Sequence, residues 1–238
     1  MRIFTSHKFP LGECPPNLGK NILAWKEYNP AYEFEYFNDE GMNEWMRNNV
    51  DSQTHNLFNK LNSGAGKADL FRVCCLYHKG GIWVDADLPA FDIDKEYDNF
   101  SELVTKNEVV IVRNRKCDNP RYTFIASVKN AILFLMLNDM INQHIKEAVE
   151  KKIHSSTIHV TGPFVLHKLL CKLCGLDNIV ELSLNVVQKI MGGSFIYIND
   201  IVPEKYTYQE ENVYSGYEDD LKSMKVTPHG SISAVKLN

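Results

Sequence analysis

The sequence lacks the features of membrane-spanning, secreted and nucleic-acid-binding proteins. It contains no uninterrupted apolar run of about 18 residues, so we expect no membrane span. Residues 1–10 lack the apolar stretch that a signal peptide needs, so we expect an intracellular, cytoplasmic protein. With 26 Lys and Arg against 30 Asp and Glu, the net charge is −4. This balance argues against nucleic acid as a partner, because such binding depends on basic surface.

Cysteine is too sparse for the disulfide framework of a small secreted domain. The chain has 6 cysteines in 238 residues, two of them adjacent at Cys74 and Cys75, and we expect reduced thiols. The hydrophobic share of 44% and the charged share of 24% are close to those of ordinary globular proteins. A chain of this length can form one α/β domain with a substantial core, so we expect a single domain over residues 1–238.

Alternating strand and helix signals predict an α/β fold. A strand at 3–6, a helix at 18–28 and a strand at 33–37 form a β-α-β opening, and Asn29-Pro30 ends its helix. In Thr161-Gly162-Pro163, Thr161 is a candidate hydroxyl cap and Pro163 suits the first turn of the following helix. Further helices are expected near 42–48, 64–78, 127–150 and 161–174, and strands at 82–85 and 109–112.

The residues that can carry chemistry gather between Gly66 and Asp92. Asp69 and Arg72 lie three positions apart on an expected helix that is otherwise largely apolar, so they share one face. Such a pair either forms a helix-surface ion pair of little energetic value or faces a polar site. After the helix, a Gly-Gly turn leads into a short apolar strand that ends at Asp85 and Asp87. Extended geometry would place these two carboxylates on one side, about 6–7 Å apart at the backbone.

Two carboxylates at a strand end outline a site for a hard divalent cation. Carboxylate oxygens suit Mg²⁺ or Mn²⁺, which commonly keep positions open for water and for substrate phosphates. Two ligands alone are too few, so we expect a diphosphate to complete the shell. His229 is a candidate third protein ligand, because imidazole binds first-row cations, although a solvated loop histidine is an equally good interpretation.

These residues resemble the sugar-binding region of DXD glycosyltransferases, the group that includes the yeast initiating mannosyltransferase, capsular polysaccharide transferases and, more distantly, the clostridial glucosylating toxins. The similarity lies in GKADLFRVCCLYHKGGIWVDADLPAFD, residues 66–92, and in NILAWKEYNPAYEFEYFND, residues 21–39. Trp83 stands where the family more often has Tyr. The carboxyl-terminal third matches only at 161–163 and around His229.

The resemblance implies a single-domain GT-A fold, with a mixed sheet flanked by helices. It implies transfer of a sugar from a nucleotide sugar, with UDP favoured over GDP, to a glycan or protein acceptor, with retained configuration and with Mn²⁺ or Mg²⁺. The donor and metal half would span about 1–115 and the acceptor half about 116–238. The expected catalytic residues are Asp69, Arg72 and Asp87; the donor site would comprise Thr5, Asp69, Arg72, Trp83, Asp85 and Ala86, the metal site Asp85, Asp87 and His229, and the acceptor side Thr161, Gly162 and Pro163.

Three alternatives stay open at this point. Trp83 either packs in the core or contacts the donor. A metal-dependent phosphohydrolase also uses Asp-x-Asp, with the first Asp as nucleophile, although Leu88-Pro89 does not fit that motif. A non-catalytic module that binds a nucleotide sugar without turnover is the third.

Overall fold

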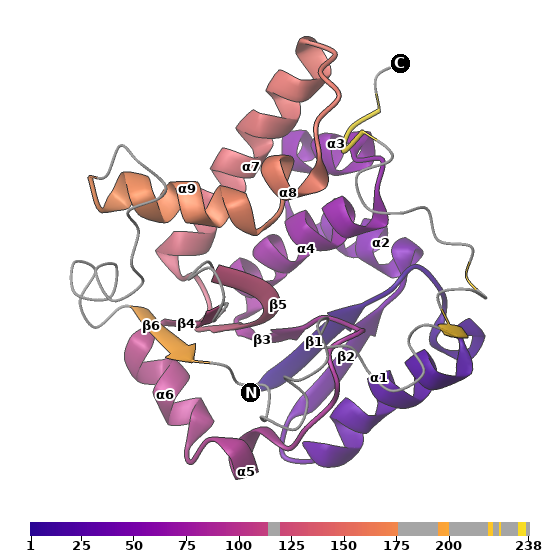
Figure 1. The fold of residues 1–238 in the computed structure, drawn as a ribbon, viewed down its shortest axis with the longest axis vertical. Coiled ribbons are helices and arrows are strands. Elements are labelled where there is room, and N and C mark those ends of the chain that lie inside the picture. The colour runs from indigo at the N-terminus through magenta and orange to yellow at the C-terminus, as the bar shows by residue number, and fades with distance from the viewer. Residues whose placement is uncertain (114–119, 176–194, 200–218, 221–223, 225–232, 237–238) are drawn as a thin grey trace.

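In the part of the chain that the structure describes, six strands form one mixed sheet with helices on both faces (Figure 1). The structure, a computed structural model, describes residues 1–113, 120–175, 195–199, 219–220, 224 and 233–236. The strand order in the sheet is β2-β1-β3-β5-β4-β6. The strands are β1 (Arg2–Ser6), β2 (Glu33–Phe37), β3 (Gly81–Val84), β4 (Val109–Arg113), β5 (Pro120–Ser127) and β6 (Phe195–Asn199).

The two sides of the sheet carry separate apolar clusters. On one side, Trp25 from α1 and Phe100 from α6 pack on Ile3, Ile82 and neighbouring sheet residues. The larger cluster on the other side includes residues of α2, α3, α4, α7 and α9. The helices are α1 (Pro16–Tyr28), α2 (Asp39–Asn49), α3 (Ser52–Lys60), α4 (Gly64–Lys79), α5 (Ile93–Glu96), α6 (Phe100–Asn107), α7 (Ile132–Glu150), α8 (Thr157–Val160) and α9 (Pro163–Leu173), with a 3₁₀ turn at Leu11–Glu13. None of these helices is both long and apolar enough to cross a membrane.

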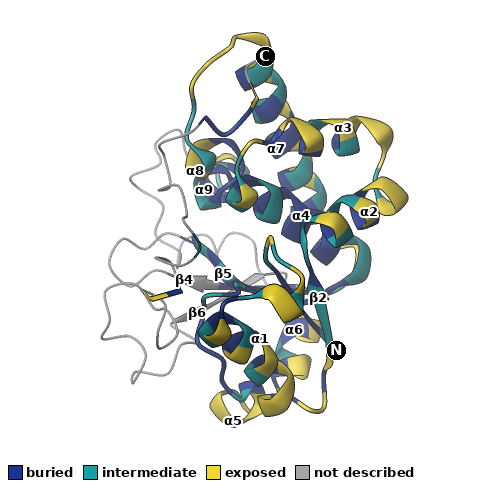
Figure 2. Ribbon diagram, turned by 90° about the vertical axis from the view of Figure 1, so that its right-hand side faces the viewer, coloured by how far each residue is buried: buried dark blue, intermediate teal, exposed yellow. Residues whose placement is uncertain are grey.

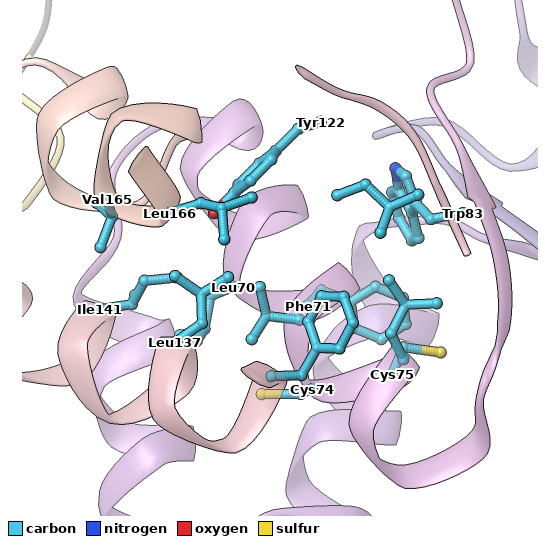
Figure 3. Packing of buried hydrophobic residues seen from close by; sticks show 14 of the residues in the cluster. Leu70, Phe71, Cys74, Cys75, Trp83, Tyr122, Leu137, Ile141, Val165 and Leu166 are labelled. Atoms are coloured by element: carbon cyan, nitrogen blue, oxygen red, sulfur yellow. The ribbon is translucent and has the colours of Figure 1, made fainter. Parts of the chain in front are cut away.

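Helix α4 is the central helix of the larger cluster. Of its 16 residues only Gly64 is exposed, whereas the outer surfaces of α2 and α3 are well exposed (Figure 2). Leu70 and Phe71 of α4 pack between Leu137 of α7 and Trp83 of β3 (Figure 3). Because α4 is almost wholly enclosed, its polar residues Asp69 and Arg72 must find their partners inside the protein.

The strands that matter for function end at the same edge of the sheet. β1 pairs in parallel with β2 and with β3, so the β-α-β opening predicted from the sequence is confirmed. The register places Phe4 opposite Trp83, and Thr5 and Ser6 therefore follow in β1 where β3 runs into Asp85. β5 runs antiparallel to β3 and continues the sheet on its other side.

Several element boundaries differ from the prediction for identifiable reasons. The helix expected from residue 127 begins at Ile132, because 120–127 form β5, a strand that the sequence analysis did not predict. Helix α3 was missed as well; it is short and begins at Ser52, after the N-cap residue Asp51, whose side chain accepts from Thr54 N at 3.0 Å. Neither element has a clear amphipathic pattern in the sequence. β5 is buried along most of its length, so its residues do not alternate between apolar and polar, and α3, with 9 residues, is too short to show a helical period.

The turn between α4 and β3 depends on its two glycines. Gly80 and Gly81 have φ of 66° and 115°, which side chains with a Cβ rarely adopt. A Cβ on Gly81 would lie 2.6 Å from the carbonyl oxygen of Arg2, and a Cβ on Gly80 would lie 2.5 Å from the backbone nitrogen of Lys129. The close packing of this turn fixes the point at which β3 starts.

We expect Gly81→Ala to destabilise the protein by about 1–3 kcal/mol from backbone strain, with the contact to Arg2 adding to that loss. Gly64→Ala is the matched control: its Cβ would meet nothing within 4 Å at the start of α4, and the change should be neutral or stabilising by up to about 1 kcal/mol. Urea unfolding of both variants measures the difference. Equal stabilities would contradict the role assigned to the turn.

Candidate functional site

Asp85 and Asp87 lie in a tight turn, which corrects the extended geometry expected from the sequence. β3 ends at Val84, and Leu88 N donates to the Asp85 carbonyl oxygen at 3.0 Å, so residues 85–88 close a four-residue turn. The turn remains attached to the sheet, because Asp85 N donates to Thr123 O at 2.9 Å. Both aspartates are partly exposed, whereas Ala86 and Leu88 are buried. The turn therefore presents two carboxylates at the sheet edge from a fixed backbone.

Arg72 joins the helix α4 to this turn through buried ion pairs. Its Nη2 lies 3.2 Å from Asp69 Oδ1 and 3.0 Å from Asp85 Oδ1, and its Nη1 donates to the carbonyl oxygen of Tyr122. The Arg72 side chain is 5% exposed and that of Asp69 is 9% exposed. Of the two interpretations of Asp69 and Arg72, the surface ion pair is therefore wrong. A guanidinium can hold three acceptors at once because its N–H groups point in fixed, different directions.

Two aromatic rings enclose the Arg72 guanidinium. Its Cζ lies 5.0 Å from the ring centroid of Trp83 and 5.0 Å from that of Tyr122. Trp83 also donates from Nε1 to Asp85 Oδ1 at 2.9 Å, so it both packs in the core and holds the first aspartate. The sequence analysis missed Tyr122. Its contribution comes from a backbone carbonyl and a ring face on β5, 50 positions away, and neither leaves a motif.

Asp69 has a second partner from the other half of the chain. The Thr161 hydroxyl donates to Asp69 Oδ2 at 2.9 Å, and Thr161 is fully buried. The cap predicted for Thr161 is wrong: Gly162 is the N-cap of α9, with no side-chain cap bond, and Pro163 is the first helical residue as expected. Burial raises the pKa of Asp69 to about 6, even though Arg72 and Thr161 act in the opposite direction.

The pair of aspartates has the chemistry of a divalent cation site. Burial raises the pKa of Asp87 to about 7, and the negative charge of Asp85 adds to the shift. Asp85 uses Oδ1 for Arg72 and Trp83, and the described residues form no hydrogen bond to its Oδ2. Within the described residues there is no group of three or more His, Cys, Asp or Glu that could hold a metal ion. The pair fits Mn²⁺ or Mg²⁺ bound together with phosphate oxygens, because such ions accept ligands from substrate.

The remaining predicted site residues are placed as follows. Thr5 is fully buried at the end of β1, and its hydroxyl, like that of Ser6, has no hydrogen-bond partner among the described residues. Ala86 is buried and packs against Leu18 and Ile22 of α1. His229 lies outside the described residues.

Part of the sequence and the fold are similar to those of known proteins. Residues 15–95 match the model of a family described as "Glycosyltransferase sugar-binding region containing DXD motif". No curated protein matches the sequence. Among solved structures six chains match, and one of them, PaToxG Glycosyltransferase, aligns with a TM-score of 0.51 over 80% of this chain and 77% of that chain at 16% identity. At this identity the structural similarity shows the fold alone.

The two findings agree with the enzyme class expected from the sequence. The family match includes Asp69, Arg72, Asp85 and Asp87, and the structural match shows a mixed α/β fold of the glycosyltransferase GT-A type. The enzyme is a glycosyltransferase with a DXD sugar-binding region. The closer resemblance to the yeast initiating mannosyltransferase stays a prediction.

We expect Arg72→Lys to destabilise the protein by about 1.5–3 kcal/mol, the range for hydrogen bonds to charged groups, because an ammonium cannot reach all three acceptors. Arg47→Lys is the matched control, since Arg47 is exposed and lies 3.9 Å from Glu44; it should change stability by less than about 0.5 kcal/mol. Chemical unfolding measures both, and a folded, fully stable Arg72→Lys would remove Arg72 from this role.

Proposed function

We propose that the protein is a metal-dependent glycosyltransferase that moves a sugar from a nucleotide sugar, with UDP favoured and GDP possible, to a glycan or protein acceptor, with retained configuration. The observation that carries the proposal is the buried Asp69–Arg72–Asp85 network directly beside Asp87 at the carboxyl edge of the sheet. Transfer of a sugar from a diphosphate requires charges that are arranged in advance, because negative charge develops on the leaving group.

Asp85 and Asp87 would hold the divalent cation, with His229 as a third protein ligand. When bound, Mn²⁺ or Mg²⁺ supplies positive charge that stabilises the departing diphosphate. Arg72 pairs with the Asp85 carboxylate and orients it, and Trp83 donates to the same carboxylate oxygen. Asp69 lies on the same face of α4 as Arg72, where a carboxylate can accept hydrogen bonds from sugar hydroxyls.

The nucleotide would lie along the ends of β1 and β3. Thr5 and Ser6 carry buried hydroxyls with no partner in the described part of the chain, and buried polar groups normally have one. A ribose or base polar group would give them that partner. The backbone N–H of Ala86, between the two aspartates, would then face the phosphates of the donor, since the Ala86 carbonyl oxygen is bound by Asn21.

The two halves of the chain would divide the work within one domain. The first half, about residues 1–115, would supply the sheet edge and the aspartates, whereas the second half brings Thr161 to Asp69. Thr161 is buried and occupied by Asp69, so it would support the acceptor side indirectly. Gly162 and Pro163 would form part of the acceptor wall.

A phosphohydrolase is disfavoured by the contacts of the first aspartate. In that chemistry the first Asp must attack phosphorus, yet Asp85 Oδ1 is held by Arg72 and Trp83. A non-catalytic module that binds the nucleotide sugar would differ from the enzyme in that it would not hydrolyse its donor. Incubating the protein with UDP-sugars and Mn²⁺ should release free sugar slowly, with its configuration retained when followed by NMR; a complete lack of hydrolysis and transfer would favour the module.

We expect UDP to bind weakly in the presence of chelator and much more tightly with Mn²⁺ or Mg²⁺, because the diphosphate completes a shell that two carboxylates only begin. Isothermal titration with UDP and GDP, each with EDTA and with Mn²⁺, measures the effect and ranks the bases. Equal affinity under both conditions would contradict the metal site.

We expect Asp87→Asn to abolish metal-dependent UDP binding and, in chelator at pH 8, to raise the melting temperature. The folded-state pKa of Asp87 is about 7, above its ordinary value of 3.8, so ionised Asp87 destabilises the folded protein. This destabilisation is absent below the ordinary pKa and grows as the pH rises towards 7. The rise should be about 2–4 °C, the shift that about 1 kcal/mol produces in a chain of this size. At pH 4 the difference should vanish; a lower melting temperature at pH 8 would contradict the assignment.

A further inference from the structure

Two side chains of α1 and that of its C-cap residue Asn29 bind the backbone of residues 86–93, a segment that begins between the two aspartates. Asn21 donates from Nδ2 to the carbonyl oxygens of Ala86 and Leu88, both at 2.8 Å, and its Oδ1 accepts from Ala90 N at 3.1 Å. Trp25 donates from Nε1 to Leu88 O at 3.3 Å. Asn29, just after the helix, donates to Phe91 O and accepts from Ile93 N, both at 2.9 Å.

The spacing of these residues explains how one helix follows the segment. Positions 21, 25 and 29 are four apart, so the three side chains lie on one face, one above the other. All three are buried, with exposed fractions of 9%, 0% and 2%. A primary amide can donate and accept at once, and both asparagines use both functions on backbone groups that would otherwise be buried without partners.

The contact of Asn21 with Ala86 has a direct consequence for Asp87. The Ala86 carbonyl and the Asp87 N–H belong to one planar peptide unit. Fixing that carbonyl therefore fixes the plane from which the Asp87 side chain starts. Asn21 also holds Leu88 O on the far side of Asp87, so one side chain binds the backbone on both sides of the second aspartate.

We propose that Asn21 is a positioning residue that sets the place of Asp87 relative to Asp85, and so the metal affinity of the pair. The inference rests on the proposed metal-dependent function. Asn21 touches neither ion nor substrate; it acts through the backbone of the turn. Groups behind metal ligands commonly change metal affinity by about ten- to hundredfold when removed, because the ligands lose their arrangement.

Helix α1 is itself fixed, so Asn21 acts from a rigid support. Its N-cap is Pro15, which offers no side-chain cap, and the Asp220 carboxylate accepts from Leu18 N at 2.8 Å instead. Met224 packs against the small cluster of Leu18, Ile22 and Ala86. Asp220 and Met224 thus hold α1 against the same turn.

Asn29 provides a matched control within the same helix face. Its side-chain hydrogen bonds, to Trp25 O, Phe91 O and Ile93 N, equal those of Asn21 in number and in atom types, and both residues are buried. They engage the segment beyond Leu88 and leave the peptide units next to Asp87 untouched. Asn21→Ala and Asn29→Ala should therefore cost similar stability but differ in their effect on the metal.

The experiment titrates Mn²⁺ into the full chain of wild type, Asn21→Ala and Asn29→Ala and follows water proton relaxation, alongside melting temperatures in chelator. We expect Asn21→Ala to weaken Mn²⁺ binding by about ten- to hundredfold and Asn29→Ala to keep wild-type affinity, with similar losses of melting temperature. Wild-type affinity in Asn21→Ala, or equal losses in both variants, would overturn the inference. Wild type that fails to bind Mn²⁺, alone or with UDP, would instead overturn the proposed function.

Should Asn21→Ala not yield folded protein, Asn21→Ser tests the same idea in a variant that keeps a small polar side chain. The shorter side chain loses the amide that binds Ala86 O, Leu88 O and Ala90 N. We expect Asn21→Ser to bind Mn²⁺ about ten- to hundredfold more weakly and the matched Asn29→Ser to keep wild-type affinity; wild-type affinity in Asn21→Ser would overturn the inference.

Discussion

The buried guanidinium of Arg72 is the interaction on which the site depends. Enclosed by Trp83 and Tyr122, it has little access to water, so its charge must be balanced within the protein. Asp69 from its own helix and Asp85 from the end of β3 supply that balance. An unpaired charge there would cost several kcal/mol, so helix α4 and the aspartate turn are held together by necessity. A shift of the sheet edge relative to α4 would break these ion pairs and leave a buried charge unpaired.

The same requirement explains why the elements around α4 are so fixed. The glycine turn sets where β3 starts, and β3 has only 4 residues before Asp85. Strand β5 supplies the Tyr122 carbonyl, and α8 leads to Thr161, whose hydroxyl donates to Oδ2 of Asp69. Each polar atom of the network is thus placed by a different element. Such a network specifies one arrangement, since a small movement leaves some buried group without its partner.

The sequence alone could group the charged residues of the candidate site because they are close together in the chain. Asp69 and Arg72 share a helical face, and Asp85 follows a recognisable Gly-Gly turn, so local periodicity and composition were sufficient. Tyr122, Asn21 and the Thr161 contact were missed because they depend on tertiary placement. Tyr122 acts through its backbone and ring, Asn21 binds backbone carbonyls, and Thr161 looked like a cap. Strand β5 was missed because its residues carry no clean alternation.

The charges of the site also favour a divalent over a monovalent ion. Three carboxylates, those of Asp69, Asp85 and Asp87, surround one guanidinium, which leaves two negative charges uncompensated among these four side chains. Burial, together with the negative charge of Asp85, raises the pKa of Asp87 to about 7, so that without an ion the Asp87 carboxyl is partly protonated near neutral pH. A dication would replace that proton and neutralise the two negative charges of the four side chains. A diphosphate would then bind to a cation at a site whose protein charges are already balanced. Release of the proton on metal binding follows from this balance, so metal affinity should rise with pH until Asp87 is fully ionised.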